Sequence, residues 1–253
     1  MTTKVPVWAK ALGSVQSALI WEFPGKKTIK VAWSVNLHKI ITLFLVLGMM
    51  FWFDNFTTGA WIYLAIHGIY GYCWLIKDLG FRDHRLEAKT SIGGAVMLYI
   101  VLIGWYWVIP YIFISQRVVP TNIELFIAVY LHTLGVVTTI AADCQRHFSL
   151  KYRKGLITDG MFKYTRNPNY LGEIMIYSSF AFLASHWIAW AVVAYATLST
   201  FFPNMYNKDA SISRHPGWQE YSTQSGLLVP WGLLNIRALR DIFGKSQLNY
   251  KPE

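Results

Sequence analysis

Charged residues are scarce in this chain, and acidic residues are the scarcest of them. Only 14% of the 253 residues are charged, whereas a soluble domain usually carries about a quarter. Hydrophobic residues make up 54% of the chain and aromatic residues 17%. The composition argues against a soluble protein and predicts one membrane-embedded unit.

The net charge of +10 would suggest nucleic acid as the partner of a soluble protein. Here the basic residues lie between apolar runs, so we expect no nucleic-acid partner.

Cysteine is also scarce, since Cys73 and Cys144 are the only two. They lie far apart and show no metal-ligand spacing, so we infer neither a disulfide nor a metal site. A secretory signal is not evident either. Residues 1–36 are basic, and no apolar core precedes a small-residue cleavage site. An amphipathic helix on the membrane surface is the simplest interpretation of this segment, and a transit-like role is the alternative.

Long apolar runs are what the chain has in quantity. A bilayer core needs about 20 apolar residues to cross, and the runs predict about six transmembrane helices in an all-α polytopic bundle. They cover residues 40–53, 59–76, 93–115, 123–142, 170–184 and 187–202. Pro110 should kink the third helix. Only Ser185 and His186 separate the last two, which predicts a tight helical hairpin.

Basic residues are distributed unevenly about these runs. With six spans, all but one of the 23 Lys and Arg residues fall on one side of the membrane, and the exception is Arg117. By the positive-inside rule both termini face the cytosol, or the matrix of a mitochondrion. The membrane could be the endoplasmic reticulum, the mitochondrial inner membrane or a bacterial inner membrane. We divide the chain into a basic segment (1–36), four helices (37–142), a C-terminal domain (143–232) and a tail (233–253).

Polar side chains inside the spans are candidates for a functional cavity. His67 and Tyr70 lie three residues apart in the second run and share a helix face, and Tyr72 follows them. Polar groups at membrane depth often line a site, although a hydrogen bond to a neighbouring helix would also satisfy them. His132 in the fourth run has the same two interpretations.

The loop before the fifth run ends in a clear helix start. Asn167 is a favoured cap and Pro168 a favoured first helical residue. Asn169 and Glu173 then lie four residues apart on one face, with Gly172 beside them, which we expect to leave room for a flat group. Arg166 precedes the free N–H groups of the helix, a suitable place for phosphate or carboxylate. The alternatives are a membrane anchor for Arg166 and a structural ion pair for Glu173.

A second polar block follows the sixth run. It contains Asn204, Lys208, Asp209, Arg214 and Tyr221 just beyond the membrane. Lys208 and Asp209 could also be a plain surface pair. Residues 215–217 predict a turn, and the apolar residues 227–231 should lie back on the bundle.

These blocks resemble the C-terminal domain of the steroid 5α-reductase superfamily. The resemblance lies in residues 160–173 (GMFKYTRNPNYLGE), in the block 203–231, and in the short polar segment 143–148 (DCQRHF). It implies a bundle whose cytosolic half binds a nucleotide. The superfamily contains NADPH-dependent reductases of steroid, sterol and enoyl double bonds, and also S-adenosylmethionine-dependent methyltransferases. The run from Asn169 to Glu173 is more similar to the reductases, because methyltransferases usually have Arg-His-Pro where this chain has Arg-Asn-Pro at 166–168.

The resemblance also implies roles for individual residues. NADPH is the implied cofactor, with S-adenosylmethionine as the alternative. The cofactor-binding residues are then Asn169 and Glu173 at the nicotinamide or ribose, Tyr164 and Arg166 at phosphates, Asp143 and Arg146 at the adenosine end, Tyr221 closing the pocket, and Asn204, Lys208, Asp209 and Arg214 from the second block. The reductases use a Gln-Glu pair and a tyrosine in their N-terminal helices. The N-terminal spans of this chain contain no Gln-Glu pair, and their nearest catalytic candidates are Tyr70, Tyr72 and His67.

Three functions follow as hypotheses. The first is an integral membrane reductase that acts on an activated C=C bond of a lipid-like substrate. The second is a non-catalytic structural subunit that keeps the fold within a larger membrane complex, with residues 235–253 either as a docking arm or as a membrane-surface helix. The third is a membrane methyltransferase. The expected partners are membrane lipid, a lipid-like small molecule and, for the second hypothesis, other membrane subunits.

Overall fold

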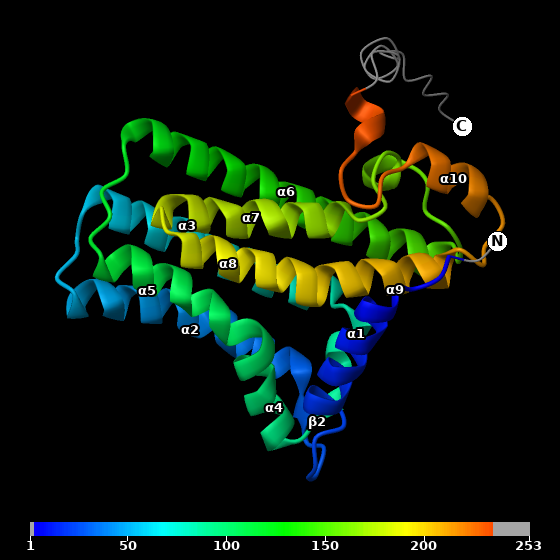
Figure 1. Ribbon diagram of the computed structural model, residues 1–253, viewed down its shortest axis with the longest axis horizontal. Helices are drawn as coiled ribbons and strands as arrows, with labels where there is room; N and C mark the ends of the chain where they lie inside the picture. Colours follow the sequence, from blue (N-terminus) through cyan, green and yellow to red (C-terminus); the bar gives the residue numbers. More distant parts are fainter. Residues whose placement is uncertain (1–2, 235–253) are drawn as a thin grey trace.

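The computed structural model describes residues 3–234 and is built almost entirely of helices (Figure 1). The helices are α1 (Val7–Ile20), α2 (Val31–Trp52), α3 (Thr58–Phe81), α4 (Ile92–Leu98), α5 (Val108–Ser115), α6 (Asn122–Tyr152), α7 (Pro168–Ala184), α8 (Trp187–Ala196), α9 (Phe202–Ile212) and α10 (Trp218–Gln224). Two short strands, β1 (Ile29–Lys30) and β2 (Lys89–Thr90), pair antiparallel with Ile29 opposite Thr90. The proposed docking arm, residues 235–253, lies outside the described residues.

The bundle has the membrane-spanning helices that the sequence predicts. Within residues 3–234, five helical segments are long and apolar enough to cross a membrane, and they are Val31–Trp52, Thr58–Phe81, Ile92–Ser115, Asn122–Tyr152 and Trp187–Ile212. The sixth, α7, has 17 residues, which is about the shortest length that crosses a bilayer. It packs along α6 in the bundle (Figure 1). The prediction of an all-α polytopic membrane bundle is confirmed.

The first span begins at Val31, earlier than the predicted run, which covers residues 40–53 and extends back only through Leu37 and His38. Its first turns contain polar residues, which the hydropathy pattern placed outside the membrane helix. Ser34 and His38 are buried and Lys39 is half-buried, so these side chains face the protein interior and the helix continues through them. The predicted boundary was wrong because a helix with one polar, inward face does not form a uniform apolar run.

The third span is bent, as Pro110 predicts (Figure 1). Between α4 and α5 the chain passes through a π-helical turn (Tyr99–Ile103) and a 3-10 turn (Gly104–Trp107). Proline has no N–H to donate to the carbonyl four residues earlier, here that of Tyr106. A second π-helical turn (Thr197–Phe201) joins α8 to α9.

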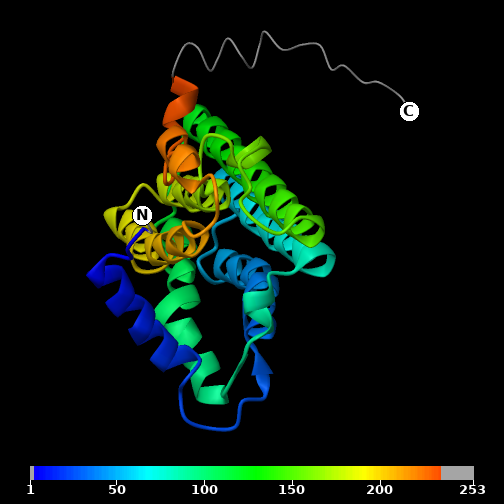
Figure 2. The same ribbon diagram turned by 90° about the vertical axis from the view of Figure 1, so that its right-hand side faces the viewer.

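The two ends of the bundle differ in what they contain. The α2–α3, α5–α6 and α7–α8 turns lie at one end, and the N-terminus, the loop 153–167 and α10 lie at the other, here called the basic end (Figures 1 and 2). Arg117 lies at the opposite end of the bundle from the basic end. Its Nη2 donates to the Phe53 carbonyl at 2.8 Å. The predicted hairpin is also present, since Ser185 adopts a left-handed conformation (φ 47°) and His186 Nδ1 accepts from the Ile188 N–H at 3.1 Å.

Glycine permits a close contact between α6 and α7. A Cβ atom on Gly172 of α7 would lie 2.5 Å from the Gly135 carbonyl oxygen and 2.7 Å from the Thr139 nitrogen, both in α6. The two backbones therefore touch at this crossing. The expectation that Gly172 leaves room for a flat ligand was wrong, because α6 fills that space.

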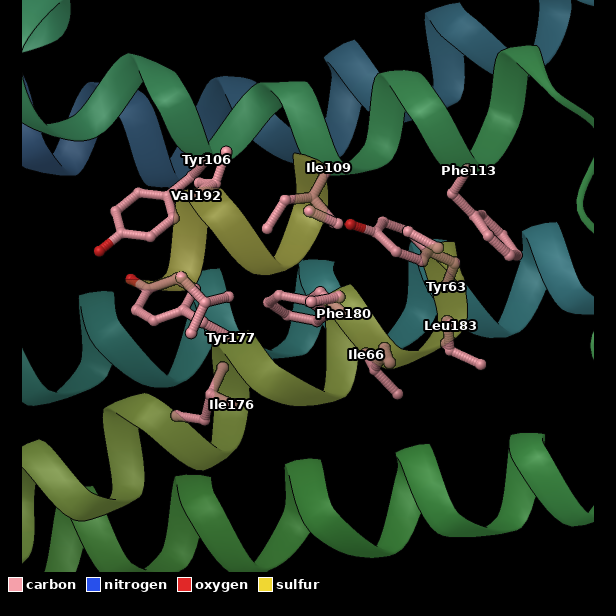
Figure 3. Close-up of a cluster of buried hydrophobic side chains, with 14 of the residues drawn as sticks. Tyr63, Ile66, Tyr106, Ile109, Phe113, Ile176, Tyr177, Phe180, Leu183 and Val192 are labelled. Atoms are coloured by element: carbon pink, nitrogen blue, oxygen red, sulfur yellow. The ribbon is translucent and has the colours of Figure 1, made fainter. Parts of the chain in front are cut away.

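The main core lies around Phe180 of α7 and is rich in aromatic rings (Figure 3). The ring of Tyr63 stacks on Phe113 with centroids 4.8 Å apart, and the ring of His67 stacks on Phe180 at 4.2 Å. His132 lies beside the same phenylalanine, at 5.5 Å. Both histidines are therefore packed core residues.

Candidate functional site

Two adjoining cavities lie toward the basic end of the bundle. The inner cavity has a volume of about 310 Å³ and the outer cavity about 870 Å³. These volumes are in the range of small-molecule sites. Six residues line both cavities, and they are Asp83, Arg85, Asp143, Arg146, Tyr170 and Asn204. One ligand could therefore extend from one cavity into the other.

The inner cavity has a polar end formed by three helices. Lys39 comes from α2, Tyr70 from α3, and Glu173 and Tyr177 from α7. The Tyr70 hydroxyl donates to Glu173 Oε2 at 2.6 Å and lies 3.4 Å from the Tyr177 hydroxyl. Lys39 Nζ donates to the Tyr177 hydroxyl at 3.3 Å. A cation, a carboxylate and two hydroxyl groups are thus held together.

Aromatic rings surround this polar group. The Lys39 ammonium lies 3.9 Å from the centre of the Tyr70 ring and 5.1 Å from that of Trp74, distances at which a cation is attracted to a ring face. Tyr106 stacks on Tyr177 with centroids 4.0 Å apart. Figure 3 shows the hydroxyl groups of Tyr106 and Tyr177 at the same end of this stack. The rings fix the tyrosines, so their hydroxyl groups present a preorganised surface to the cavity.

The other end of the inner cavity is apolar. It lies beside a second, smaller core that is separate from the main one and is centred on Ile20, Val31 and Leu98. The apolar residues that line it are Trp21, Val31, Val35, Leu86, Leu98, Leu102 and Ile103. The cavity is therefore amphipathic, with one polar end and one apolar end.

An ion-pair network lies where the two cavities adjoin. Lys77 of α3 pairs with Asp143 of α6, and both side chains are buried. Arg146 lies 3.0 Å from the Asp83 carboxylate and 3.6 Å from that of Asp143. Burial alone would raise the pKa of Asp83. The hydrogen bonds and charge of Arg85, together with the charge of Arg146, instead hold that pKa below its usual range. Asp83 is therefore charged at neutral pH.

The outer cavity is strongly basic. Its lining includes six Lys or Arg residues and only two carboxylates. The cations are Arg82, Arg85, Arg146, Lys151, Arg166 and Lys208, and the acids are Asp83 and Asp143. Among the described residues Lys151 and Lys208 pair with no carboxylate, and Lys208 donates instead to the Arg166 carbonyl. The cavity therefore suits an anionic ligand.

Arg166 and Tyr221 form the wall of the outer cavity near α10. Arg166 Nε donates to Asp209 at 2.8 Å, and its Nη1 donates to the Ser225 carbonyl. The Tyr221 hydroxyl donates to the Phe162 carbonyl at 2.7 Å, and burial raises the pKa of Tyr221 to about 12. It stays protonated at neutral pH and keeps this hydrogen bond. The wall ties α10 and the loop 153–167 to α9.

The helix start before Glu173 is present, with one difference. Asn167 occupies the cap position and Pro168 the first turn of α7, as predicted. The Asn167 side chain does not cap the helix, however, because its amide donates to the Leu227 carbonyl at 2.8 Å. It holds residues 227–228 against the bundle, where both leucines pack on the main core.

Most of the predicted cofactor residues lie at the cavities. Eight line one or both of them, and they are Asp143, Arg146, Arg166, Asn169, Glu173, Asn204, Lys208 and Tyr221. Asp209 lies behind Arg166 as its ion-pair partner. Tyr164 and Arg214 line neither cavity, since the Tyr164 ring packs near Gly232 and Arg214 bonds to Ser211 on the surface.

The three predicted catalytic residues are not brought together. Tyr70 lies at the polar end of the inner cavity. His67 is stacked in the main core, and the Tyr72 side chain is 58% exposed on the outer surface of the bundle. Residues 70 and 72 are separated by about 200° around a helix, so they could not both face the cavity.

Several site residues were missed by sequence reasoning. Lys39, Lys77, Asp83 and Arg85 were counted only as positive-inside charges or loop residues, and Tyr177 was taken as part of an apolar run. For Lys39 and Lys77 a signal existed, because an ionisable residue inside a membrane helix is a functional candidate by default. The predicted topology places residues 1–39 and 77–91 outside the membrane, so both lysines fell outside the predicted spans.

Comparison with known proteins identifies a family. A family model described as "Protein of unknown function (DUF1295)" matches residues 26–206. The chain belongs to the DUF1295 family. The matched region contains the whole polar end of the inner cavity. An uncharacterised protein of Schizosaccharomyces pombe is 33% identical to this DUF1295 chain over 63 residues. These residues span 22% of the chain and 23% of the yeast protein. No solved structure matches the chain.

Proposed function

We propose that this DUF1295 protein is an integral membrane reductase that uses NADPH to reduce an activated C=C bond in a lipid-like substrate, such as a steroid, a sterol or an enoyl lipid. The observation that carries the proposal is the junction of two unlike cavities. A basic cavity suited to an anionic nucleotide adjoins an aromatic, amphipathic cavity suited to a lipid with one polar group. The resemblance of residues 143–148, 160–173 and 203–231 to the C-terminal domain of the steroid 5α-reductase superfamily supports the same function.

The residues of the outer cavity fit NADPH by their chemistry. NADPH is a polyanion, and the outer cavity offers lysines without carboxylate partners, Lys151 and Lys208. These two, with Arg85 and Arg146, would hold phosphate groups. Asn169 and Glu173 line the inner cavity and would meet the nicotinamide end. When bound, NADPH supplies a hydride to the substrate carbon. The protein supplies orientation and charge.

The charge of the outer cavity favours a reductase over a methyltransferase. S-adenosylmethionine carries a positive sulfonium group, whereas the lining holds six cationic side chains and two carboxylates. Like charges at short range disfavour binding. The anionic cofactor is therefore the better electrostatic match.

The Lys208→Met variant should bind NADPH more weakly than the native chain. A charge-assisted hydrogen bond contributes roughly 1.5–3 kcal/mol, so we expect the Kd to rise about tenfold or more. The measurement is isothermal titration of NADPH into the detergent-solubilised full chain. Lys89→Met is the matched control, because Lys89 is exposed in β2 and lines neither cavity. Equal affinities for all three proteins would remove Lys208 from the site.

The nucleotide that co-purifies with the protein tests the function itself. Mass spectrometry of the chain purified in mild detergent should detect NADPH or NADP⁺. S-adenosylhomocysteine in its place would show a methyltransferase. No nucleotide, together with co-purifying membrane subunits, would favour the structural subunit.

A further inference from the structure

We propose that Lys39 is the group that binds the substrate's polar end, and that this end is a neutral carbonyl oxygen. The inference rests on the proposed function and specifies its substrate class and a catalytic residue. Lys39 lies in the first membrane span, in α2, and lines the inner cavity. Among the residues described, it makes no direct ion pair with a carboxylate, although the charge of Glu173 acts on it, and its Nζ atom contacts the Tyr177 hydroxyl and the faces of aromatic rings.

The Lys39 ammonium makes no direct ion pair with a carboxylate among the described residues, and it therefore retains donor capacity. An ammonium group has three N–H donors, and one of them reaches the Tyr177 hydroxyl at 3.3 Å. The ring faces of Tyr70 and Trp74 stabilise the charge without accepting a strong hydrogen bond. At least one donor is therefore available to a ligand oxygen in the inner cavity.

The charges at this end favour a neutral oxygen over a carboxylate. Glu173 lies at the same end and accepts from the Tyr70 hydroxyl at 2.6 Å. Lys39 and Glu173 together contribute no net charge, so a substrate carboxylate would meet the Glu173 carboxylate as well as the lysine. A ketone or aldehyde oxygen accepts from Lys39 without that repulsion.

The apolar end of the inner cavity defines the rest of the substrate. It is lined by Val31, Val35, Leu98, Leu102 and Ile103, and none of these side chains offers a polar atom. A ligand whose oxygen is at Lys39 would place hydrocarbon against them. Together with the proposed reduction of an activated C=C bond, this lining favours an α,β-unsaturated ketone or aldehyde with an extended apolar body.

The position of Lys39 explains how the double bond would be activated. When a hydride adds to the β-carbon, the electron pair of the C=C bond moves toward the carbonyl, and negative charge develops on its oxygen. The Lys39 ammonium donates to that oxygen and stabilises the enolate. A proton from solvent then adds to the α-carbon, and the carbonyl is restored. Tyr70, Tyr177 and Glu173 act as positioning residues that hold the ammonium in place.

The test uses the full chain in detergent and a long-chain α,β-unsaturated ketone labelled with ¹³C at its carbonyl. With NADP⁺ present there is no turnover, and isotope-edited infrared spectroscopy reports the hydrogen bond to the carbonyl. We expect the band to shift to lower frequency on binding to the native chain and to the Lys89→Met control. In Lys39→Met it should return to the position of the free ketone, and in Lys39→Arg a shift should remain.

Rate and affinity measurements complete the test. With NADPH, single-turnover reduction of the same ketone should slow about a hundredfold or more in Lys39→Met, as for loss of one oxyanion donor. The NADPH affinity of this variant should stay unchanged, which also shows that it is folded. An unshifted band in the native chain, or an equal shift in Lys39→Met, overturns the assignment of Lys39. Absence of NADPH binding by the native chain overturns the reductase function, and a Lys39-dependent band shift would then still support the carbonyl site.

Discussion

Replacing Asp143 by asparagine should lower the free energy of unfolding by roughly 3 kcal/mol or more. Asp143 is 5% exposed and Lys77, its partner, is 7% exposed. The substitution keeps the shape of the side chain but leaves the Lys77 ammonium buried without its counter-charge. Removing one member of a buried pair is costly for that reason, whatever the net contribution of the intact pair. Unfolding by a denaturing detergent, followed by circular dichroism, measures the change.

Two further variants separate burial from charge in this prediction. The double variant Lys77→Met with Asp143→Leu should recover most of the lost stability, because it removes both charges and fills the space. Asp54→Asn is the matched control, since Asp54 pairs with Arg117 at 3.4 Å but its side chain is 84% exposed. Exposed pairs contribute about 1 kcal/mol or less. A loss for Asp54→Asn as large as that for Asp143→Asn would show that burial does not decide the effect.

The Gly172→Ala variant should destabilise the bundle by about 1–3 kcal/mol, although it adds only one methyl group. The new Cβ would lie 2.5 Å from the Gly135 carbonyl oxygen, which is backbone and cannot turn aside. Helices α6 and α7 would have to move apart. Because Asn169 and Glu173 are carried by α7, NADPH affinity should fall as well. Thermal unfolding and titration of the purified protein measure the two effects.

Gly48 provides the control for this substitution. It also lies inside a long helix, α2, but a Cβ atom there would meet nothing within 4 Å. Replacing a helix-interior glycine by alanine without a clash stabilises by roughly 0.5–1 kcal/mol. Gly48→Ala should therefore leave the unfolding temperature unchanged or raise it. If Gly172→Ala also leaves the unfolding temperature unchanged or raises it, the contact between α6 and α7 has room for the extra methyl group.

The sequence predicted the bundle and the site residues at the start of α7 well. It predicted less well which residues of α2 and α3 meet α7. Hydropathy located the spans because membrane helices need long apolar stretches, and Asn167-Pro168 located the start of α7 because its local geometry demands such residues. Once that start was fixed, Glu173 had to lie one turn inside the helix. The residues at the helix start were therefore sufficient to predict the position of Glu173.

The polar end of the inner cavity depends on which residues of separate helices meet. Lys39 and Tyr177 are 138 positions apart in the chain, and only the packing of α2, α3 and α7 brings their side chains together. Nothing in the local pattern distinguishes Tyr70, which faces the cavity, from Tyr72, which faces outward. The rotation of each helix about its axis is a property of the whole bundle, and a single sequence does not state it.

The two separate cores support different ends of the inner cavity. The polar end is carried by helices of the main core, and the apolar end lies beside the smaller core around Val31 and Leu98. Substitutions in the smaller core can change the length and width of the apolar end and leave Lys39 and Glu173 in place. Under the proposed function, such substitutions would change which lipid fits the cavity and would leave the reacting end as it is, and exchanging α1 and α4 between DUF1295 proteins would test this separation.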